Sequence, residues 1–270
     1  MGEITIMKGL SLLFCLILLV DIAPAMAGER MVLIDPGQIK ATPKQRFEKL
    51  KPFYIDSFEV SIRQFTEFIQ QTNYKGYKGY RKPRKQDLEK GANRVHWFEA
   101  ARYCQWKGKR LPTETEWLLA AGGEGRKFPW GNDHIDGKRA NHCDVNCTAP
   151  WANFNNDDHF KRMAPVGSYP GGSTPEGVYD LAGNVWEWTS TVYSNGESLV
   201  FKGKEQPLDD MEVEMVIKGG SYGSKDEQLQ NGHRSKSAAS LRSSYVGFRC
   251  AKDKDRPVRI GSQKDMTQAK

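Results

Sequence analysis

The first strong hydrophobic signal of the chain is an uncharged apolar run near its N-terminus. Leu10–Val20 (LSLLFCLILLV) follows the positive charge of Lys8, and Ala25–Ala27 then supplies a small-x-small cleavage site before Gly28. A transmembrane anchor is the alternative, but these 11 residues fall short of the roughly 20 that span a bilayer. We therefore expect residues 1–27 to be a cleaved signal peptide. The mature protein would then be periplasmic or secreted, with no stable membrane span.

Short apolar segments follow, separated by polar loops. Met31–Ile34 (MVLI) and Pro52–Ile55 (PFYI) have the length and composition of strands. Three helices are predicted farther along the chain. The first starts at Ser61, the second covers Trp97–Trp106, and the third runs from Thr113 to Gly122 or Gly123.

Local capping signals define where these helices begin. Ser61 with Gln64, and Thr113 with Glu116, have the spacing of capping boxes, in which two side chains satisfy free N–H groups reciprocally. His96 lies just before the second helix, where we expect it to cap or pack rather than to bind a metal. After the third helix the helical period disappears. Residues 128–193 are rich in Gly, Asn, Asp, Pro and Trp, and such a long irregular stretch needs a disulfide, a metal or a function to hold it.

Composition and charge exclude some classes of protein. The chain is 38% hydrophobic and 27% charged, as globular domains are. Its formal net charge is +7, but the basic residues are dispersed among 33 acids and no nucleic-acid-binding motif accompanies them. No nucleic-acid partner is therefore expected.

The cysteine count favours disulfides. Cys15 leaves with the signal peptide, and four cysteines remain for an oxidising compartment. Cys143 and Cys147 are close enough to close a small loop, which leaves Cys104 for Cys250. That long loop would contribute about 4–5 kcal/mol in the chain-entropy model. A metal site formed by Cys143, Cys147 and His142 is the alternative, although no second cysteine pair at zinc spacing supports it.

Several long motifs occur in a fixed order along the mature chain. They include HWFEAARYCQWKGKRLPTETEWLLAAGG, FPWGN, APVGSYPGG, VYDLAGNVWEWT, IKGGSYGS and VGFRCAK, after the opening segments MVLIDPG and PFYIDSFEVS. In this order they resemble the formylglycine-generating enzyme and sulfatase-modifying factor family, over about Met31–Lys252. The resemblance implies an α+β, C-type-lectin-like fold that is largely irregular, with small antiparallel sheets and about three helices. We place this domain at residues 28–252 and a disordered polar tail at 253–270.

The same resemblance implies structural calcium. One site would use the side chains of Asn141 and Asp158 with the carbonyls of His142 and Phe160. A second would use the side chains of Asp180 and Glu187 with the carbonyls of Gly183 and Val185. All of these are oxygen donors, as calcium requires. From the residue types alone, the Asn and Asp residues could instead make ordinary turns. With the family register the second site is favoured, because the CDVNCTAPWANFNN segment interrupts the first.

The family's catalytic cysteines are missing. Active members oxidise a substrate cysteine with two copper-binding cysteines, which follow the GGSY motif. The matching positions here are Ser224 and a residue near Leu229. A hydroxyl is a poor ligand for soft Cu(I), and leucine has no ligand atom. No copper and no formylglycine-generating activity are therefore expected.

Two functions remain open. The first is a calcium-stabilised domain that binds a protein, peptide or glycan outside the cytoplasm, or assists the maturation of a partner. The second is an exported tailoring oxidase or modifying enzyme acting on a peptide or protein through a rebuilt pocket. Candidate pocket residues are Ser221, Tyr222, Ser224, Trp186, His233, Arg234 and Tyr245. No base or oxyanion hole is evident for a serine nucleophile.

Overall fold

The computed structural model describes residues 30–36, 50–74, 82–123, 125–201 and 213–255. The predicted signal peptide and residues 256–270 of the predicted tail lie outside this part. The ordered domain extends slightly farther than expected, because Asp253 is the last residue of a strand.

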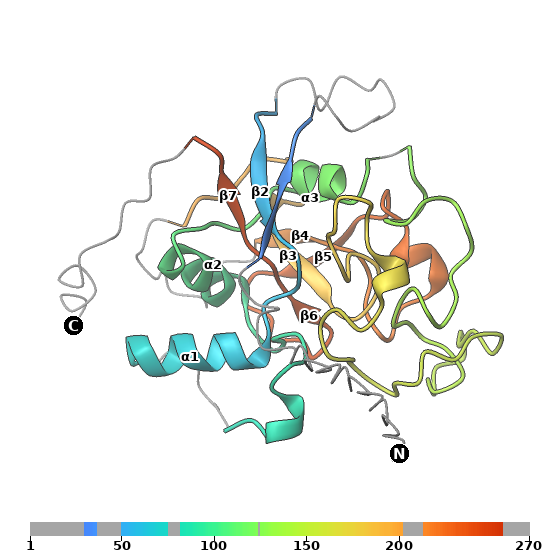
Figure 1. The fold of residues 1–270 in the computed structure, drawn as a ribbon. Helices are drawn as coiled ribbons and strands as arrows, with labels where there is room; N and C mark the ends of the chain where they lie inside the picture. Colours follow the sequence, from blue (N-terminus) through green and yellow to red (C-terminus); the bar gives the residue numbers. More distant parts are fainter. Residues whose placement is uncertain (1–29, 37–49, 75–81, 124, 202–212, 256–270) are drawn as a thin grey trace, which may run out of the picture.

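A three-stranded antiparallel sheet joins the two ends of the domain (Figure 1). β2 (Phe53–Asp56) lies in its centre, with β1 (Met31–Ile34) on one side and β7 (Ala251–Asp253) on the other. Both strands predicted from the N-terminal half are confirmed. The second starts one residue later than expected, since Pro52 has no N–H to donate to a ladder. The buried side chains of this sheet pack on those of α3 (Glu114–Ala120).

A four-stranded sheet forms the second layer. Its order is β5 (Ser235–Ala238), β4 (Glu214–Lys218), β3 (Trp186–Val192) and β6 (Val246–Gly247). The first three pair antiparallel as expected, whereas β3 and the two-residue β6 pair parallel. A parallel pair needs a long connection, which the intervening β4 and β5 provide. Most of the remaining chain is irregular, in agreement with the expected fold class.

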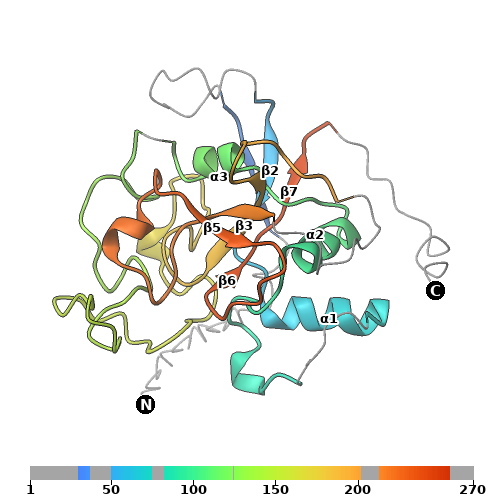
Figure 2. The same cartoon turned by 180° about the vertical axis from the view of Figure 1, so that it is seen from behind.

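The three predicted helices are present and start where their caps predicted. α1 covers Ile62–Thr72, α2 covers Trp97–Trp106, and α3 follows Thr113. Each has a complete capping box. His96 serves as the cap of α2. Its Nδ1 accepts from the N–H of Glu99, and the Glu99 carboxylate in turn accepts from the N–H of His96. α1 and α2 lie on the same side of the molecule in both views (Figures 1 and 2).

The Ser61 cap gives a testable stability contribution. Ser61→Ala removes the Oγ that accepts from the N–H of Gln64, which leaves one helix donor without its partner. We expect a loss of about 1 kcal/mol in the free energy of unfolding, measured in urea. Ser61→Asn should recover most of it, because asparagine is an equally good cap. A loss as large for the asparagine variant would show that the hydroxyl has another role.

Both predicted disulfides are confirmed. Cys104 of α2 is bonded to Cys250, with 5.6 Å between their Cα atoms, and Cys143 is bonded to Cys147. The alternative metal site is thus wrong, since both of its sulfurs are in a disulfide. Disulfides of this kind are consistent with a location outside the cytoplasm. In the described ranges, no helix has the length and hydrophobicity needed to cross a membrane.

Candidate cation sites and the serine pocket

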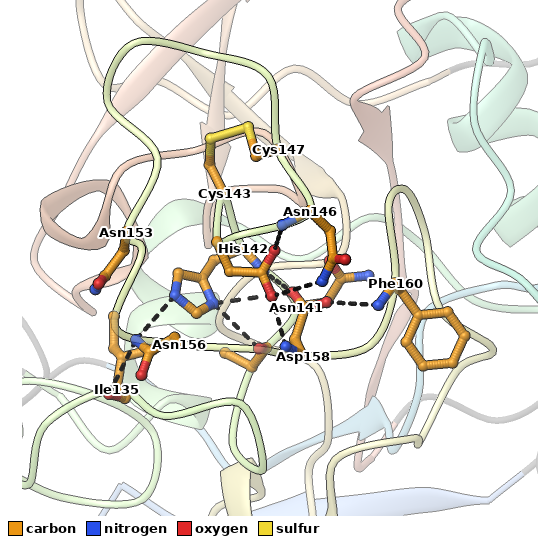
Figure 3. Close-up of polar contacts among 12 residues, drawn as sticks. Ile135, Asn141, His142, Cys143, Asn146, Cys147, Asn153, Asn156, Asp158 and Phe160 are labelled. Atoms are coloured by element: carbon orange, nitrogen blue, oxygen red, sulfur yellow. Dashed lines mark hydrogen bonds and ion pairs between the residues drawn. A yellow bond between two sulfur atoms is a disulfide. The ribbon is translucent and has the colours of Figure 1, made fainter.

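The structure brings the four residues of the first predicted cation site together (Figure 3). The Asp158 carboxylate lies between two backbone segments. Its Oδ2 accepts from the N–H of His142 at 2.9 Å, and its Oδ1 accepts from the N–H of Phe160 at 2.8 Å. The chain therefore wraps around this carboxylate at the points where the two predicted carbonyl ligands lie.

Two features of this site fit a hard cation such as calcium, which prefers oxygen ligands. Asn141 is buried, and among the described residues nothing donates to its Oδ1, while its Nδ2 donates to the carbonyl of Arg162 and to Oδ1 of Asn184. The Asp158 side chain is also buried, and that burial raises its pKa to about 7. An unpartnered amide oxygen beside a desolvated carboxylate is the donor chemistry that calcium binds.

A third side chain, not predicted from the sequence, organises this loop. The buried Asp144 accepts from the N–H of Asp158 at 2.5 Å and from the backbone N–H of Asn146 at 2.8 Å. The Cys143–Cys147 disulfide closes the same turn (Figure 3). The inserted segment that seemed to interrupt the site thus supports it. An Asp-x-Asn turn next to the cysteine pair was the available sequence signal.

The second predicted set lies directly against the first. The N–H of Asn184 donates to the carbonyl of Asn141 at 2.9 Å, so the two loops meet backbone to backbone. Gly183 has φ +86°, and a Cβ there would lie 2.0 Å from that same carbonyl oxygen. Only glycine permits this approach. Asp180 accepts from the N–H of Gly167 at 2.6 Å.

Glu187, the remaining ligand of the second set, is already paired with a cation of the protein. The buried Arg249 guanidinium donates to both of its oxygens at 2.7 Å, and Nε1 of Trp117 donates to Oε2 at 2.8 Å. Arg249 also donates to three carbonyls, those of Asp56, Ser57 and Tyr179. This bidentate pair neutralises the carboxylate, so the second set fits an added cation less well than the first.

Glu59 completes this buried charge cluster. Its carboxylate accepts from Nδ2 of Asn184 at 2.5 Å and from the N–H of Val185 at 3.1 Å. Burial, followed by the charges of Asp180 and Glu187, holds the pKa of Glu59 well above its usual range. Across the described residues no group of three His, Cys, Asp or Glu side chains is arranged to hold a metal, so calcium at the first set would need the Asn141 amide and backbone carbonyl oxygens in addition to the Asp158 carboxylate.

Ser221 and Ser224, two of the candidate pocket residues, are buried in the turn after β4. The Oγ of Ser224 is 3.3 Å from the Oγ of Ser221 and accepts from the N–H of Ser221 at 3.0 Å. Leu229 is fully buried in an apolar cluster with Phe128 and Ile135, and it lies against Gly220. Ser224 and Leu229 thus both border Gly220–Ser221, one with a hydroxyl and the other with a hydrocarbon side chain.

Six of the seven candidate pocket residues lie close to this turn or to one another. Tyr222 stacks on Tyr245 at 4.8 Å between ring centres, and the ring of Trp186 is 5.8 Å from that of His233. Arg234 is the exception, because its guanidinium pairs with Glu114 at 2.9 Å and covers the ring of Tyr193. Among the described residues, no hydrogen bond or ring contact joins Arg234 to the other six candidates.

Comparisons with known proteins agree with this fold. The family model for the "Sulfatase-modifying factor enzyme 1-like domain" matches residues 19–254. The chain is 30% identical to the formylglycine-generating enzyme of Bos taurus over 286 aligned positions, covering 85% of this chain and 74% of that protein. It is 29% identical to "Inactive C-alpha-formylglycine-generating enzyme 2" of Mus musculus, covering 77% of each.

A solved structure supports the same architecture. PvdO from Pseudomonas aeruginosa superimposes with a TM-score of 0.56 at 22% identity, covering 83% of this chain and 91% of that one. The expected α+β, C-type-lectin-like fold is therefore confirmed. Because relatives named as active and as inactive match about equally well, overall identity does not decide activity. The chain belongs to the sulfatase-modifying factor enzyme 1-like family.

Proposed function

We propose that this protein is a sulfatase-modifying-factor-like domain without copper-dependent formylglycine-generating activity. One sequence feature carries the proposal: by the family resemblance, Ser224 and a residue near Leu229 fall where copper-binding cysteines are expected. Cu(I) prefers thiolates, and all four cysteines of the described chain are in disulfides. The hydroxyls of Ser221 and Ser224 are bonded to each other and to backbone N–H groups, with no acid or base among their described partners.

We further infer a binding or maturation-accessory role outside the cytoplasm, with calcium at the first cation site. The unpartnered oxygen of Asn141 and the buried carboxylate of Asp158 support calcium there. Bound calcium would neutralise Asp158 and fix the loop around residues 141–160. Aromatic side chains gather among the candidate residues, with Tyr222 stacked on Tyr245 and Trp186 next to His233, and this supports recognition of a protein, peptide or glycan.

The test is to restore the missing thiols. The wild-type protein should neither bind Cu(I) nor convert the cysteine of a sulfatase-motif peptide to formylglycine, as judged by mass spectrometry. Ser224→Cys/Leu229→Cys should gain binding of one Cu(I), because both side chains border Gly220–Ser221. Ser224→Ala/Leu229→Val is the control without sulfur and should gain none.

Two results would overturn the proposal. Stoichiometric copper or iron in the wild-type protein would mean that the pocket holds a metal through other ligands. Turnover of a peptide or protein substrate with that metal would establish the alternative, an exported tailoring oxidase or modifying enzyme.

A further inference from the structure

Of the two disulfides, the one between Cys143 and Cys147 is within reach of solvent. Cys147 is partly exposed, and Val145 between the two cysteines is 42% exposed. Cys104 and Cys250 are both fully buried. Thiol–disulfide exchange requires a sulfur that an attacking thiolate can reach. A reductant in solution can therefore attack Cys147 in the folded protein, while the Cys104–Cys250 bond is shielded.

The fold should survive the opening of this disulfide. Its cysteines are separated by 4 positions in the sequence, against 146 for the other pair, and a short closed loop restricts the unfolded chain less than a long one. The surrounding loop is also attached to the turn after β4. The N–H of Cys143 donates to the carbonyl of Ser224 at 3.2 Å, and Nε1 of Trp151 donates to the carbonyl of Gly223 at 3.1 Å. Reduction should therefore change mainly the turn between the two cysteines.

That turn contacts two of the four predicted ligands of the first cation site. The N–H of Asp144 donates to the carbonyl of His142 at 3.0 Å, and the Asp144 carboxylate accepts from the N–H of Asp158 at 2.5 Å. The turn itself fixes Asp144, which accepts from the N–H of Asn146 at its side chain and from the N–H of Cys147 at its carbonyl. The disulfide lies beside this polar network (Figure 3). Closing the turn thus positions Asp144 against both ligands.

Asp144 and Asp158 are acidic side chains held together away from water. Both are buried, and two carboxylates in such a position repel each other when ionised. Burial is the main cause of the raised pKa of Asp158, and the charge of Asp144 raises it further. A closed disulfide keeps Asp144 in place against this repulsion, and a bound divalent cation reduces the repulsion. Because both favour the same arrangement, each should favour the other.

We propose that the Cys143–Cys147 disulfide is a thiol-exchange site, and that its closure sets the calcium affinity of the first cation site through Asp144 as a positioning residue. The inference rests on the calcium proposed above for that site. A thiolate of a dithiol reductant attacks the sulfur of Cys147 and releases Cys143 as a thiolate. The second thiol of the reductant then displaces Cys147 and closes the reductant's own disulfide. Two electrons and two protons pass from the dithiol to the protein, which is left with two cysteine thiols.

The experiment measures calcium affinity by isothermal titration calorimetry before and after the mature chain is treated with dithiothreitol. Mass spectrometry after alkylation should find Cys143 and Cys147 modified and Cys104 and Cys250 still bonded. Reduction should weaken calcium binding about tenfold, as the loss of a group that orients a metal ligand does. By reciprocity, calcium should make the disulfide about tenfold harder to reduce at equilibrium, or about 30 mV for a two-electron couple.

Three variants identify the route of this coupling. Cys143→Ser/Cys147→Ser should bind calcium as the reduced protein does and should not respond to dithiothreitol. Asp144→Asn should lose the response as well, because the carboxylate through which the disulfide acts is gone. Asp157→Asn is the matched control at an exposed neighbouring carboxylate and should keep the tenfold difference. Melting curves in EDTA establish that each variant and the reduced protein are folded.

Each outcome separates this inference from the calcium proposal. Calcium bound with equal affinity by the oxidised and reduced proteins overturns the inference and leaves the calcium proposal standing. A tenfold difference that persists in Asp144→Asn, or a Cys104–Cys250 bond that opens first, also overturns the inference alone. An oxidised wild-type protein that binds no calcium overturns both.

Discussion

Arg249→Met is expected to lower the free energy of unfolding by about 3–5 kcal/mol, as measured by urea denaturation. Arg249 is fully buried, and its guanidinium is the cation that Glu187 contacts through both oxygens. Methionine fills a similar volume but leaves Glu187 with only the Trp117 N–H as a described donor. It also leaves Glu59 and Asp180 without the positive charge that lowers their pKa values.

The loss should depend on pH in a defined direction. A buried carboxyl without its cation is costly only while it is ionised, so the variant should be most destabilised at pH 8 and less so at pH 5. Arg63→Met is the control, because the Arg63–Glu89 pair is about half exposed on both sides and contributes at most about 1 kcal/mol. Equal effects of the two substitutions would contradict the role assigned to Arg249.

The features that the sequence predicted well are those that depend on near neighbours. The helix starts depend on side chains three residues apart. Both predicted capping boxes are present, and the structure adds a third at His96 and Glu99. The disulfides followed from a count of four cysteines, two of them four residues apart. The family resemblance then supplied the fold class, although not the parallel pairing of β6 with β3.

The charge cluster could not be predicted in this way. Glu187 and Arg249 are 62 residues apart, and Glu59 is 125 residues from the Asn184 side chain that it accepts from. No periodicity links such positions, because they meet only when the irregular loops have packed. For that reason the sequence favoured the second cation set, whereas in the structure Glu187 of that set is paired with Arg249. Trp151 is a similar case, since its partner Gly223 lies 72 residues away.

Adding calcium to protein that has been stripped of metal by EDTA is expected to raise its free energy of unfolding substantially. At a thousandfold excess over the dissociation constant, one site that exists only in the folded state adds about 4 kcal/mol. Asp158→Asn should abolish this gain, because it removes the only carboxylate of the predicted first site. Asp157→Asn is the matched control, since its carboxylate is half exposed and outside the predicted ligand set. It should respond to calcium as the wild type does.

The pH dependence provides an independent check on the same carboxylate. Burial raises the pKa of Asp158 from 3.8 to about 7 in the cation-free fold, so the folded state holds this proton more tightly than the unfolded state does. Without calcium, the contribution of this group is therefore greatest below pH 4 and is lost as the pH rises to about 7. Calcium binds the ionised form, so the difference in stability between calcium and EDTA should widen over that window and then level off. Thermal melting at several pH values measures this difference, in which the other titrating groups largely cancel. A difference that is constant with pH, or that persists in Asp158→Asn, would place the calcium elsewhere and leave Asn141 Oδ1 and Asp158 as buried groups of a loop that holds no cation.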